Sequence, residues 1–167
     1  MERIARSHHA RSIEVARTPE EAARLMAARR SAFPALARVA PTTILEDATV
    51  PRSELVKMVR HIQATAKRYN LKIGTFGHMG DGNLHPTFLT NEKDGEETQR
   101  VERAMRDIFE YALALGGTIT GEHGVGLAKR EYLPKALGSA GLRVSRDFKK
   151  AMDPYGILNP GKIFALH

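Results

Sequence analysis

The sequence predicts an α+β domain, in which an antiparallel or mixed sheet has helices packed on one face. Strand-like and helix-like patterns alternate along the 167 residues, without an internal repeat or a low-complexity tract. Two strand-like segments are joined by Asp81 and Gly82, and an Asp-Gly pair between strands is a strong signal for a β-hairpin. Two longer segments carry apolar residues at the spacing of an amphipathic helix. These three observations favour a small sheet covered by helices.

The first part of the chain predicts a helix end, a short strand and a full helix. Residues 1–10 have the pattern of a helix end, and residues 12–16 (SIEVA) have the composition of a strand. Residues 18–21 (TPEE) start a helix, with a threonine that can cap it, a proline at its first position and a glutamate that completes a capping box. We expect this helix to continue until Pro34 interrupts it.

A strand and an amphipathic helix are predicted next. Residues 42–50 (TTILEDATV) have strand character, and Pro51 ends the strand. Ser53 is expected to cap the following helix, which Tyr69 and Asn70 close. The apolar positions of this helix follow a period of 3.6 residues, and they are Leu55, Val56, Met58, Val59, Ile62 and Ala66.

The predicted hairpin consists of residues 71–78 and 83–90, and residues 91–95 form a turn after it. A long helix is expected at residues 96–115, where the glycine pair at 116–117 stops it. Its apolar face consists of Val101, Met105, Ile108, Phe109 and Ala112. The remaining elements are a short strand (GTITG), two helices at about 127–138 and 140–152, and the tail DPYGILNPGKIF.

The composition excludes several kinds of function. The chain has no cysteine, which excludes disulfides, thiolate zinc sites, iron–sulfur clusters and cysteine nucleophiles. It has no apolar run long enough to span a membrane and no apolar signal core near its start, so we expect a cytoplasmic location. The net charge is +7, but the basic residues are scattered among acids, which indicates a solvated basic surface rather than a nucleic-acid site and is compatible with small anionic substrates.

The first cluster of chemically active residues is the glycine-rich segment GHMGDGNLH at residues 77–85. If Asp81 and Gly82 form a two-residue turn, His78 lies directly opposite His85, with the Cβ atoms about 5 Å apart. Two imidazoles in such positions can chelate one metal ion, and the glycines leave room for a ligand near the backbone. The alternative is a glycine-rich turn that carries two surface histidines.

The second cluster, GEHGVG at residues 121–126, places a carboxylate beside an imidazole at a strand end, where active sites often lie. Glu122 could complete a metal site of two histidines and one carboxylate, and His123 could act as a base near neutral pH. An ordinary turn between a strand and a helix is the alternative. A third segment, NPGK, begins at Asn159, which could cap the preceding turn or simply end the fold.

Taken together, the segments GHMGDGNLHP, GEHGVGLAKREYL and DPYGILNPGKIF resemble the C-terminal part of the FAD-linked oxidase family. This family includes the flavin subunit of glycolate oxidase, D-lactate dehydrogenases and D-2-hydroxyglutarate dehydrogenase. ARRSAFPAL and ILEDATVPRSEL also resemble its connecting segments, so the resemblance covers nearly the whole chain. It implies one substrate or cap domain over residues 1–167, with a ferredoxin-like sheet, and a helical tail at 140–167 that packs on the flavin domain. The family's N-terminal FAD-binding domain is expected to be absent from these residues.

The resemblance also implies a role for each cluster. His78, His85 and Glu122 match the ligands of a divalent metal ion such as zinc, manganese or iron. His123 matches the catalytic residue that takes the hydroxyl proton of the substrate.

Further residues match the substrate and cofactor contacts of the family. Arg30, with Arg29 beside it, matches the arginine that binds the substrate carboxylate. Asn159 matches an asparagine near the flavin, and Gly80 and Asn83 are expected on the cofactor side of the site.

The function implied is hydride transfer from a small 2-hydroxy acid to FAD, with an FAD-binding domain or subunit as the partner. Thr87 and Leu45 replace an asparagine and a lysine of some 2-hydroxyglutarate enzymes, which favours monoacids such as glycolate or D-lactate. The lone chain is expected to be inactive. The alternatives are a metal-binding domain without redox function, hydrolase-like or a truncated remnant, and a non-enzymatic interaction subunit that forms a homodimer.

Overall fold

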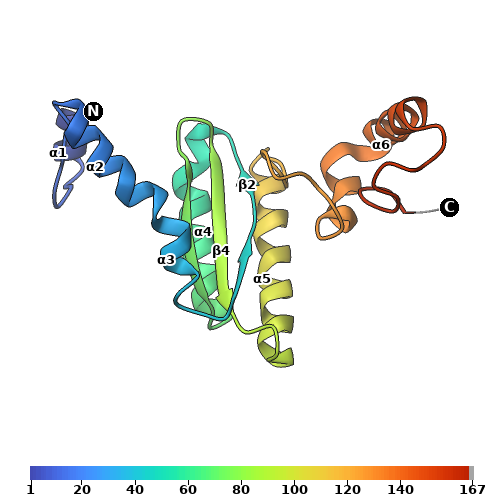
Figure 1. Cartoon of the computed structure of the whole chain (residues 1–167), viewed down its shortest axis with the longest axis horizontal. Coiled ribbons are helices and arrows are strands. Elements are labelled where there is room, and N and C mark those ends of the chain that lie inside the picture. Colours follow the sequence, from blue (N-terminus) through green and yellow to red (C-terminus); the bar gives the residue numbers. More distant parts are fainter. Residues whose placement is uncertain (166–167) are drawn as a thin grey trace. The chain divides into compact units, whose positions relative to one another are not determined.

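The computed structural model describes residues 1–165 and shows an α+β chain, as the sequence predicts (Figure 1). The chain divides into two units, Met1–Arg38 and Val39–His167, and each is described by itself. The first unit is helical, and the second contains a four-stranded antiparallel sheet with its helices. The pattern of residues therefore identifies the fold class correctly.

Three helices make up the first unit: α1 (Glu2–Ser7), α2 (Pro19–Arg30) and α3 (Ala32–Leu36). Thr18 caps α2 as predicted, because its Oγ1 accepts a hydrogen bond from the backbone N–H of Glu21 at 3.2 Å. The break comes at Ser31, ahead of Pro34, because a proline ring clashes with the helical carbonyl group four residues before it. The strand predicted at residues 12–16 is wrong. Among the described residues, no strand lies in position to pair with residues 12–16. A strand without a neighbour would leave its backbone N–H and C=O groups without partners.

The second unit is built on four strands: β1 (Thr42–Leu45), β2 (Ala48–Thr49), β3 (Lys72–His78) and β4 (Asn83–Thr90). The other three strands all pair with β4 in antiparallel orientation, and β1 and β2 share one register along it. Between them Pro86 has no N–H to contribute, although its carbonyl accepts a hydrogen bond from the N–H of Glu46 at 3.1 Å. The single strand predicted at residues 42–50 is therefore present as two short strands in one line.

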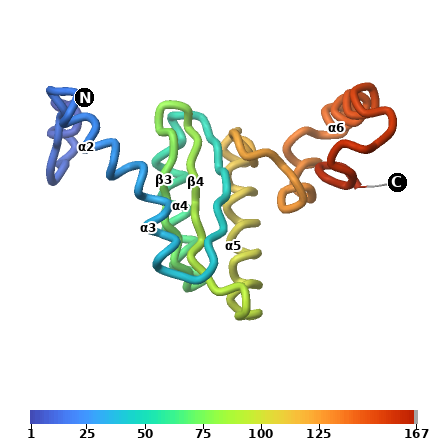
Figure 2. Tube along the Cα trace, in the orientation of Figure 1, coloured from blue at the N-terminus to red at the C-terminus, as the bar shows by residue number. Residues whose placement is uncertain are grey.

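The hairpin of β3 and β4 has a longer turn than predicted (Figure 2). His78 pairs with Asn83, not with His85, and His85 lies opposite Phe76. The four-residue turn is closed by a hydrogen bond of 3.0 Å from the N–H of Asp81 to the carbonyl of His78. The register differs from the predicted one by two positions, and side chains alternate between faces with a period of two. His78 and His85 therefore still share a face, as diagonal neighbours.

Two long helices, α4 (Leu55–Arg68) and α5 (Gly95–Ala114), cover one face of the sheet (Figure 1). The core between them and β4 includes Leu84, Phe88, Met58, Ile62, Val101 and Ile108. Since side chains alternate along a strand, the residues of β4 on the other face are Asn83, His85, Thr87 and Leu89. The packing of the helices on one face, as predicted, thus leaves the polar side chains of β4 on the opposite face.

The starts of these two helices differ in their capping. α4 follows a 3₁₀ turn, η1 (Arg52–Glu54), and no side chain caps it, so the predicted cap at Ser53 is wrong. Asn70, at φ 51°, closes α4 as predicted. α5 begins after Asp94, whose carboxylate accepts hydrogen bonds of 3.0 Å from the N–H groups of Glu96 and Glu97.

The segment after α5 joins the sheet at one residue only. Thr118 forms a β-bridge with Thr49, so the strand predicted at residues 117–121 is reduced to a single bridge. The N–H groups of residues 121–123 donate to the carboxylate of Asp47, and for that reason they cannot extend the ladder. Across the sheet, the bridge at Thr118 lies beside the line formed by β1 and β2, β4 comes next, and β3 is at the far edge. This is the ferredoxin-like strand order.

The C-terminal part contains η2 (Arg130–Tyr132) and α6 (Leu133–Met152). Gly138 breaks α6 at φ 66° and ψ 177°, so two helical pieces are present as predicted, although the first begins at Leu133 and not at 127. The last two residues of the predicted tail at 140–167 lie outside the described residues. Over residues 1–165, none of the helices combines the length and apolarity that a membrane crossing requires.

Candidate functional site

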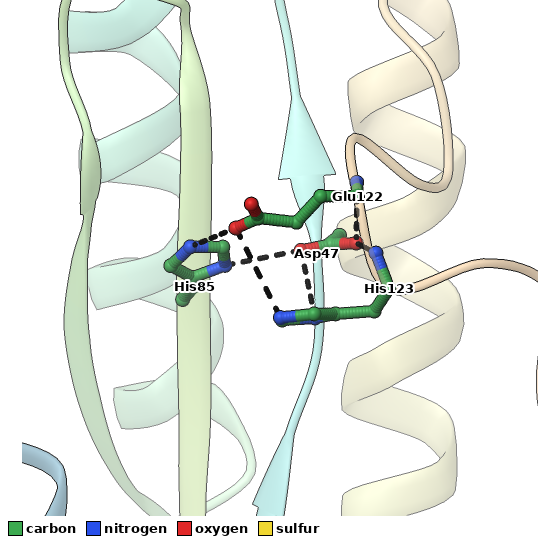
Figure 3. Close-up of side chains that lie close together, drawn as sticks. All are labelled: Asp47, His85, Glu122 and His123. Atoms are coloured by element: carbon green, nitrogen blue, oxygen red, sulfur yellow. Dashed lines mark hydrogen bonds and ion pairs between the residues drawn. The ribbon is translucent and has the colours of Figure 1, made fainter.

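Asp47 lies at the centre of a cluster of two histidines and a glutamate (Figure 3). The shared register of β1 and β2 sets Asp47 opposite His85 of β4, and Asp47 Oδ1 lies 3.0 Å from His85 Nδ1. The same oxygen lies 2.9 Å from Nδ1 of His123, which belongs to the loop between α5 and η2. Asp47 is fully buried and His85 nearly so. One carboxylate oxygen thus contacts two imidazole rings, whose centroids are 5.0 Å apart.

The second oxygen of Asp47 binds the GEHG loop. Oδ2 accepts backbone hydrogen bonds of 3.0 to 3.3 Å from residues 121–123 and a hydroxyl hydrogen bond of 3.1 Å from Thr120. Burial raises the pKa of Asp47, but the N–H of His123 and the charge of Lys129, with the other donors, outweigh burial and lower the pKa to about 2. Asp47 is therefore an ionised acceptor at neutral pH.

Glu122 brings one carboxylate oxygen to three histidines. Its Oε1 lies 3.0 Å from His85 Nε2, 3.3 Å from His78 Nε2 and 4.0 Å from His123 Nε2. The side chain of Glu122 is half exposed, so this oxygen lies on the open side of the cluster. One ligand atom each from Asp47, His85, Glu122 and His123 lies within 4.8 Å of the others. Imidazole nitrogens and carboxylate oxygens are common ligands of divalent metals, so the arrangement can hold such an ion.

Asn83 connects Glu122 to β2. The Nδ2 of Asn83 donates a long hydrogen bond of 3.5 Å to Glu122 Oε1, and its Oδ1 accepts one of 2.8 Å from the hydroxyl of Thr49. Gly121 leaves space for this amide, because a Cβ there would lie 2.6 Å from both the Asn83 side chain and Thr49 Oγ1. The first glycine of GEHG is therefore required by a close approach of side chains.

A buried ion pair between Lys129 and Glu46, the residue before Asp47, lies next to the cluster. Lys129 Nζ lies 3.1 Å from Glu46 Oε2 and 3.7 Å from Asp47 Oδ2, and 5.6 Å from the centroid of the Phe109 ring. Burial raises the pKa of Glu46, and the charge of Lys129 opposes that rise. Lys129 therefore compensates two buried carboxylates at once.

The structure brings together five of the residues predicted for the site: His78, His85, Glu122, His123 and Asn83. Gly80 is exposed in the hairpin turn, and Asn159 is exposed at φ 47° in the segment that follows α6. Arg29 and Arg30 are exposed in the last turn of α2, in the first unit. The roles predicted for all nine residues stay predictions.

Sequence reasoning missed the roles of Asp47, Thr49 and Lys129. The signal for Asp47 was present, because two acids stand inside the apolar strand pattern TTILEDATV. An acid in a buried strand needs hydrogen-bond donors, and the histidines were the available ones. Only the register of β1 and β2 on β4 shows which histidine faces Asp47.

Comparison with known proteins identifies the class of protein that carries this fold and site. The family model of the C-terminal domain of FAD linked oxidases matches residues 1–163. The chain therefore belongs to this family, as its three sequence segments predict.

Two curated relatives are bacterial glycolate oxidase subunits named GlcD. The one from Bacillus subtilis is 54% identical over 165 residues, which are 99% of this chain and 35% of that protein. The one from Escherichia coli K12 is 35% identical over 92% of this chain and 31% of that protein. A mitochondrial D-lactate dehydrogenase [cytochrome] from Arabidopsis thaliana is 32% identical over 100% of this chain and 30% of that protein. The chain spans about a third of the length of these relatives.

Proposed function

We propose that the chain forms the substrate-binding part of an FAD-dependent 2-hydroxy-acid dehydrogenase or oxidase of the glycolate or D-lactate type. The family and the names of the relatives support the reaction class. The single observation that carries the proposal is the position of Glu122 Oε1 within 3.0 to 4.0 Å of the Nε2 atoms of three histidines. Such a convergence of donors at an open, half-exposed position fits a polar ligand-binding site.

His78, His85 and Glu122 would hold a divalent metal ion. Their donor set is two imidazoles and one carboxylate, which suits zinc, manganese or iron and leaves positions open for a substrate. When bound, the ion would polarise the carboxylate and hydroxyl oxygens of a 2-hydroxy acid and make its hydroxyl group more acidic. The chelate of two neighbouring oxygens explains why a 2-hydroxy acid, and not a simple carboxylic acid, would be the ligand.

His123 would accept the hydroxyl proton on Nε2, because its Nδ1 contacts Asp47. A flavin, when bound by its own domain, would accept the α-hydrogen as a hydride with the electron pair of the C–H bond, while the C–O single bond becomes a carbonyl. Arg30, with Arg29 beside it, is our candidate for binding the substrate carboxylate. The chain's own residues thus position the acid and move its proton.

The residues beside the site favour a small monoacid. Leu45 and Thr87 face each other across β1 and β4, two residues along from Asp47 and His85 and on the same face. Thr87 is fully buried and its hydroxyl donates to the carbonyl of His85 at 3.4 Å, so this pair offers no charge to a second carboxylate. This supports glycolate or D-lactate over a dicarboxylic 2-hydroxy acid.

The flavin would come from a separate FAD-binding domain or subunit. The βαβ type of dinucleotide site needs a parallel sheet, whereas the described sheet is antiparallel. Gly80, Asn83 and Asn159 are our candidates for contacts on the cofactor side. The helical tail from residue 140 would pack on the flavin domain, and its exposed apolar side chains include Val144, Phe148, Met152, Tyr155 and Ile157.

The proposed site can be tested with Mn²⁺ as a paramagnetic probe. We expect the Mn²⁺-loaded chain to broaden the NMR lines of glycolate more than those of acetate, which lacks the hydroxyl group, and Glu122→Gln to remove the difference. Equal broadening of the two acids would contradict the proposal and favour a metal-binding domain without redox function. The lone chain with added FAD should not oxidise glycolate or D-lactate at an appreciable rate.

A further inference from the structure

We propose that Asp47 is the positioning residue of the site, which holds a proton on Nδ1 of His85 and of His123, so that His123 keeps a lone pair on Nε2 and His85 can bind a metal ion only through Nε2. The inference rests on the proposed function for its use in catalysis, but its geometry stands by itself. Asp47 Oδ1 lies 3.0 Å from His85 Nδ1 and 2.9 Å from His123 Nδ1 (Figure 3).

A carboxylate only accepts hydrogen bonds, so both Nδ1 atoms must donate. In a neutral imidazole the other nitrogen is then an acceptor. On His123 that nitrogen is Nε2, which lies 4.0 Å from Glu122 Oε1 and so keeps its lone pair. His85 Nε2 lies 3.0 Å from the same oxygen, so in the metal-free chain a proton lies between these two atoms, and a metal ion would take its place. A carboxylate that orients a metal-binding histidine through its second nitrogen is the usual outer-shell arrangement in metal sites. Here one carboxylate would do this for a ligand and for the base together.

The contacts of Asp47 argue against a role as a metal ligand. A carboxylate offers about four lone-pair sites, and both oxygens of Asp47 already have partners. Oδ1 contacts the two rings, and Oδ2 accepts from Thr120 Oγ1 and from the N–H groups of residues 121–123. The side chain is fully buried beneath these partners. Asp47 therefore links the β-strand, the GEHG loop and the two imidazoles in one unit.

An amide cannot replace this carboxylate. In Asp47→Asn, the amide oxygen can satisfy either the donors around Oδ2 or the two imidazoles, and its NH₂ group must face the other set. The donors around Oδ2 outnumber the rings, so the oxygen should turn toward the loop and the NH₂ group toward Nδ1. Each Nδ1 then becomes an acceptor and the ring proton moves to Nε2, where it blocks metal binding.

The experiment is long-range ¹H–¹⁵N NMR of the metal-free chain with labelled histidine, at mildly alkaline pH where imidazoles are neutral, together with Zn²⁺ titrations. In the wild type we expect the Nδ1–H tautomer for His123, because only its Nδ1 lies within hydrogen-bond distance of a carboxylate. In Asp47→Asn we expect the Nε2–H tautomer and a Zn²⁺ affinity that is lower by roughly 10- to 100-fold. The matched controls are Glu46→Gln, the adjacent buried carboxylate, and Thr120→Val, which removes one donor to Oδ2 and the acceptor of the Gly124 N–H but leaves both oxygens of Asp47 in place.

Both controls should keep the wild-type tautomer. A wild-type chain with the Nε2–H tautomer of His123 would overturn the inference even if Asp47→Asn fails to fold, and so would an unchanged tautomer in a folded Asp47→Asn. A wild-type chain that has the expected tautomer but does not bind Zn²⁺ would instead contradict the proposed metal site. The two proposals therefore fail in different ways.

Discussion

Lys129 Nζ lies 3.1 Å from Glu46 Oε2, and the two side chains retain only 4% and 6% of their exposure to solvent. The pair lies against the strand line that carries Asp47, so the stability of the fold and the shape of the site depend on the same residues. An isolated buried charge is costly, whereas a compensated pair is tolerated.

Lys129→Met should destabilise the chain by about 3–5 kcal/mol, because it leaves Glu46 buried without its partner. The double variant Lys129→Met/Glu46→Gln should recover part of this loss, since no unpaired charge then remains at Glu46. Urea unfolding of the two variants measures the effect. Lys135→Met is the matched control, because Lys135 pairs with Glu110 on the surface and such pairs contribute at most about 1 kcal/mol. A Lys129 variant as stable as the Lys135 control would contradict the role given to the pair.

Gly121→Ala should disturb the site through one methyl group. Its Cβ would lie 2.6 Å from the Asn83 side chain and from Thr49 Oγ1, so one of them must move. We expect a loss of roughly 1–3 kcal/mol in unfolding free energy and weaker Zn²⁺ binding, because Asn83 donates to Glu122. Gly80→Ala is the control, since a Cβ there meets no atom within 4 Å. If both variants have the unfolding free energy and the Zn²⁺ affinity of the wild type, the close approach at Gly121 does not contribute to stability or to the site.

Glu122→Gln should separate metal binding from folding. The side chain is half exposed, so its replacement should change the unfolding free energy by less than about 0.5 kcal/mol. The loss of a ligand should lower the Zn²⁺ affinity by more than the roughly 10- to 100-fold that an outer-shell partner contributes. Calorimetric titration measures the affinity, with Glu110→Gln as an exposed carboxylate outside the cluster. Equal affinity in both variants would exclude Glu122 as a ligand.

The segment after α6 should loosen in acid. A hydrogen bond from Lys149 is the main cause that lowers the pKa of Asp153, and the N–H groups of Leu158 and Ile157 lower it further, although burial opposes them. A carboxyl whose pKa is lowered by folding stabilises the fold above its unfolded pKa, near 3.8, and this contribution disappears as the pH falls through the lower folded value. Hydrogen exchange at Ile157 and Leu158 should therefore accelerate below about pH 4, beyond the intrinsic pH trend of exchange.

Asp153→Asn should produce the same loosening at neutral pH, because a neutral amide binds Lys149 and the two N–H groups less strongly. The N–H groups of α4 serve as the internal reference in both experiments, and their protection should not change. Protection of Ile157 and Leu158 that is independent of both pH and the substitution would show that Asp153 does not hold this segment.

Much of the fold follows from local patterns. The helical faces of α4 and α5 and the strand pattern of β4 are periodic in the sequence, and the amphipathic period determines which side is buried. The strand predicted at residues 12–16 fails because strand composition alone does not supply a partner. The helix cap predicted at Ser53 fails because Pro51 leads into a 3₁₀ turn instead.

The site was predictable in its residues but not in its contacts. Glycine-rich surroundings mark His78, His85, Glu122 and His123, and the structure brings the three histidines to one oxygen of Glu122. The turn of the hairpin is two residues longer than predicted. Because side chains alternate between the two faces of a strand, a shift of two residues leaves both histidines on the same face. Asp47 was missed because its role depends on a register between segments that are far apart in the sequence.

We propose that these residues bind a 2-hydroxy acid and take its hydroxyl proton while a flavin accepts its hydride, and a chimera tests this most directly. The chain would replace the matching segment of the Bacillus subtilis glycolate oxidase subunit GlcD, which is 54% identical to it. The measurement is the rate at which glycolate or D-lactate reduces the bound flavin without oxygen, in the chimera and in its His123→Asn variant. We expect reduction by one of these acids, slowed at least roughly 100-fold in the variant, whose flavin and metal contents should not change. A flavin-loaded chimera that neither acid reduces, or a variant as fast as the chimera, would contradict the account.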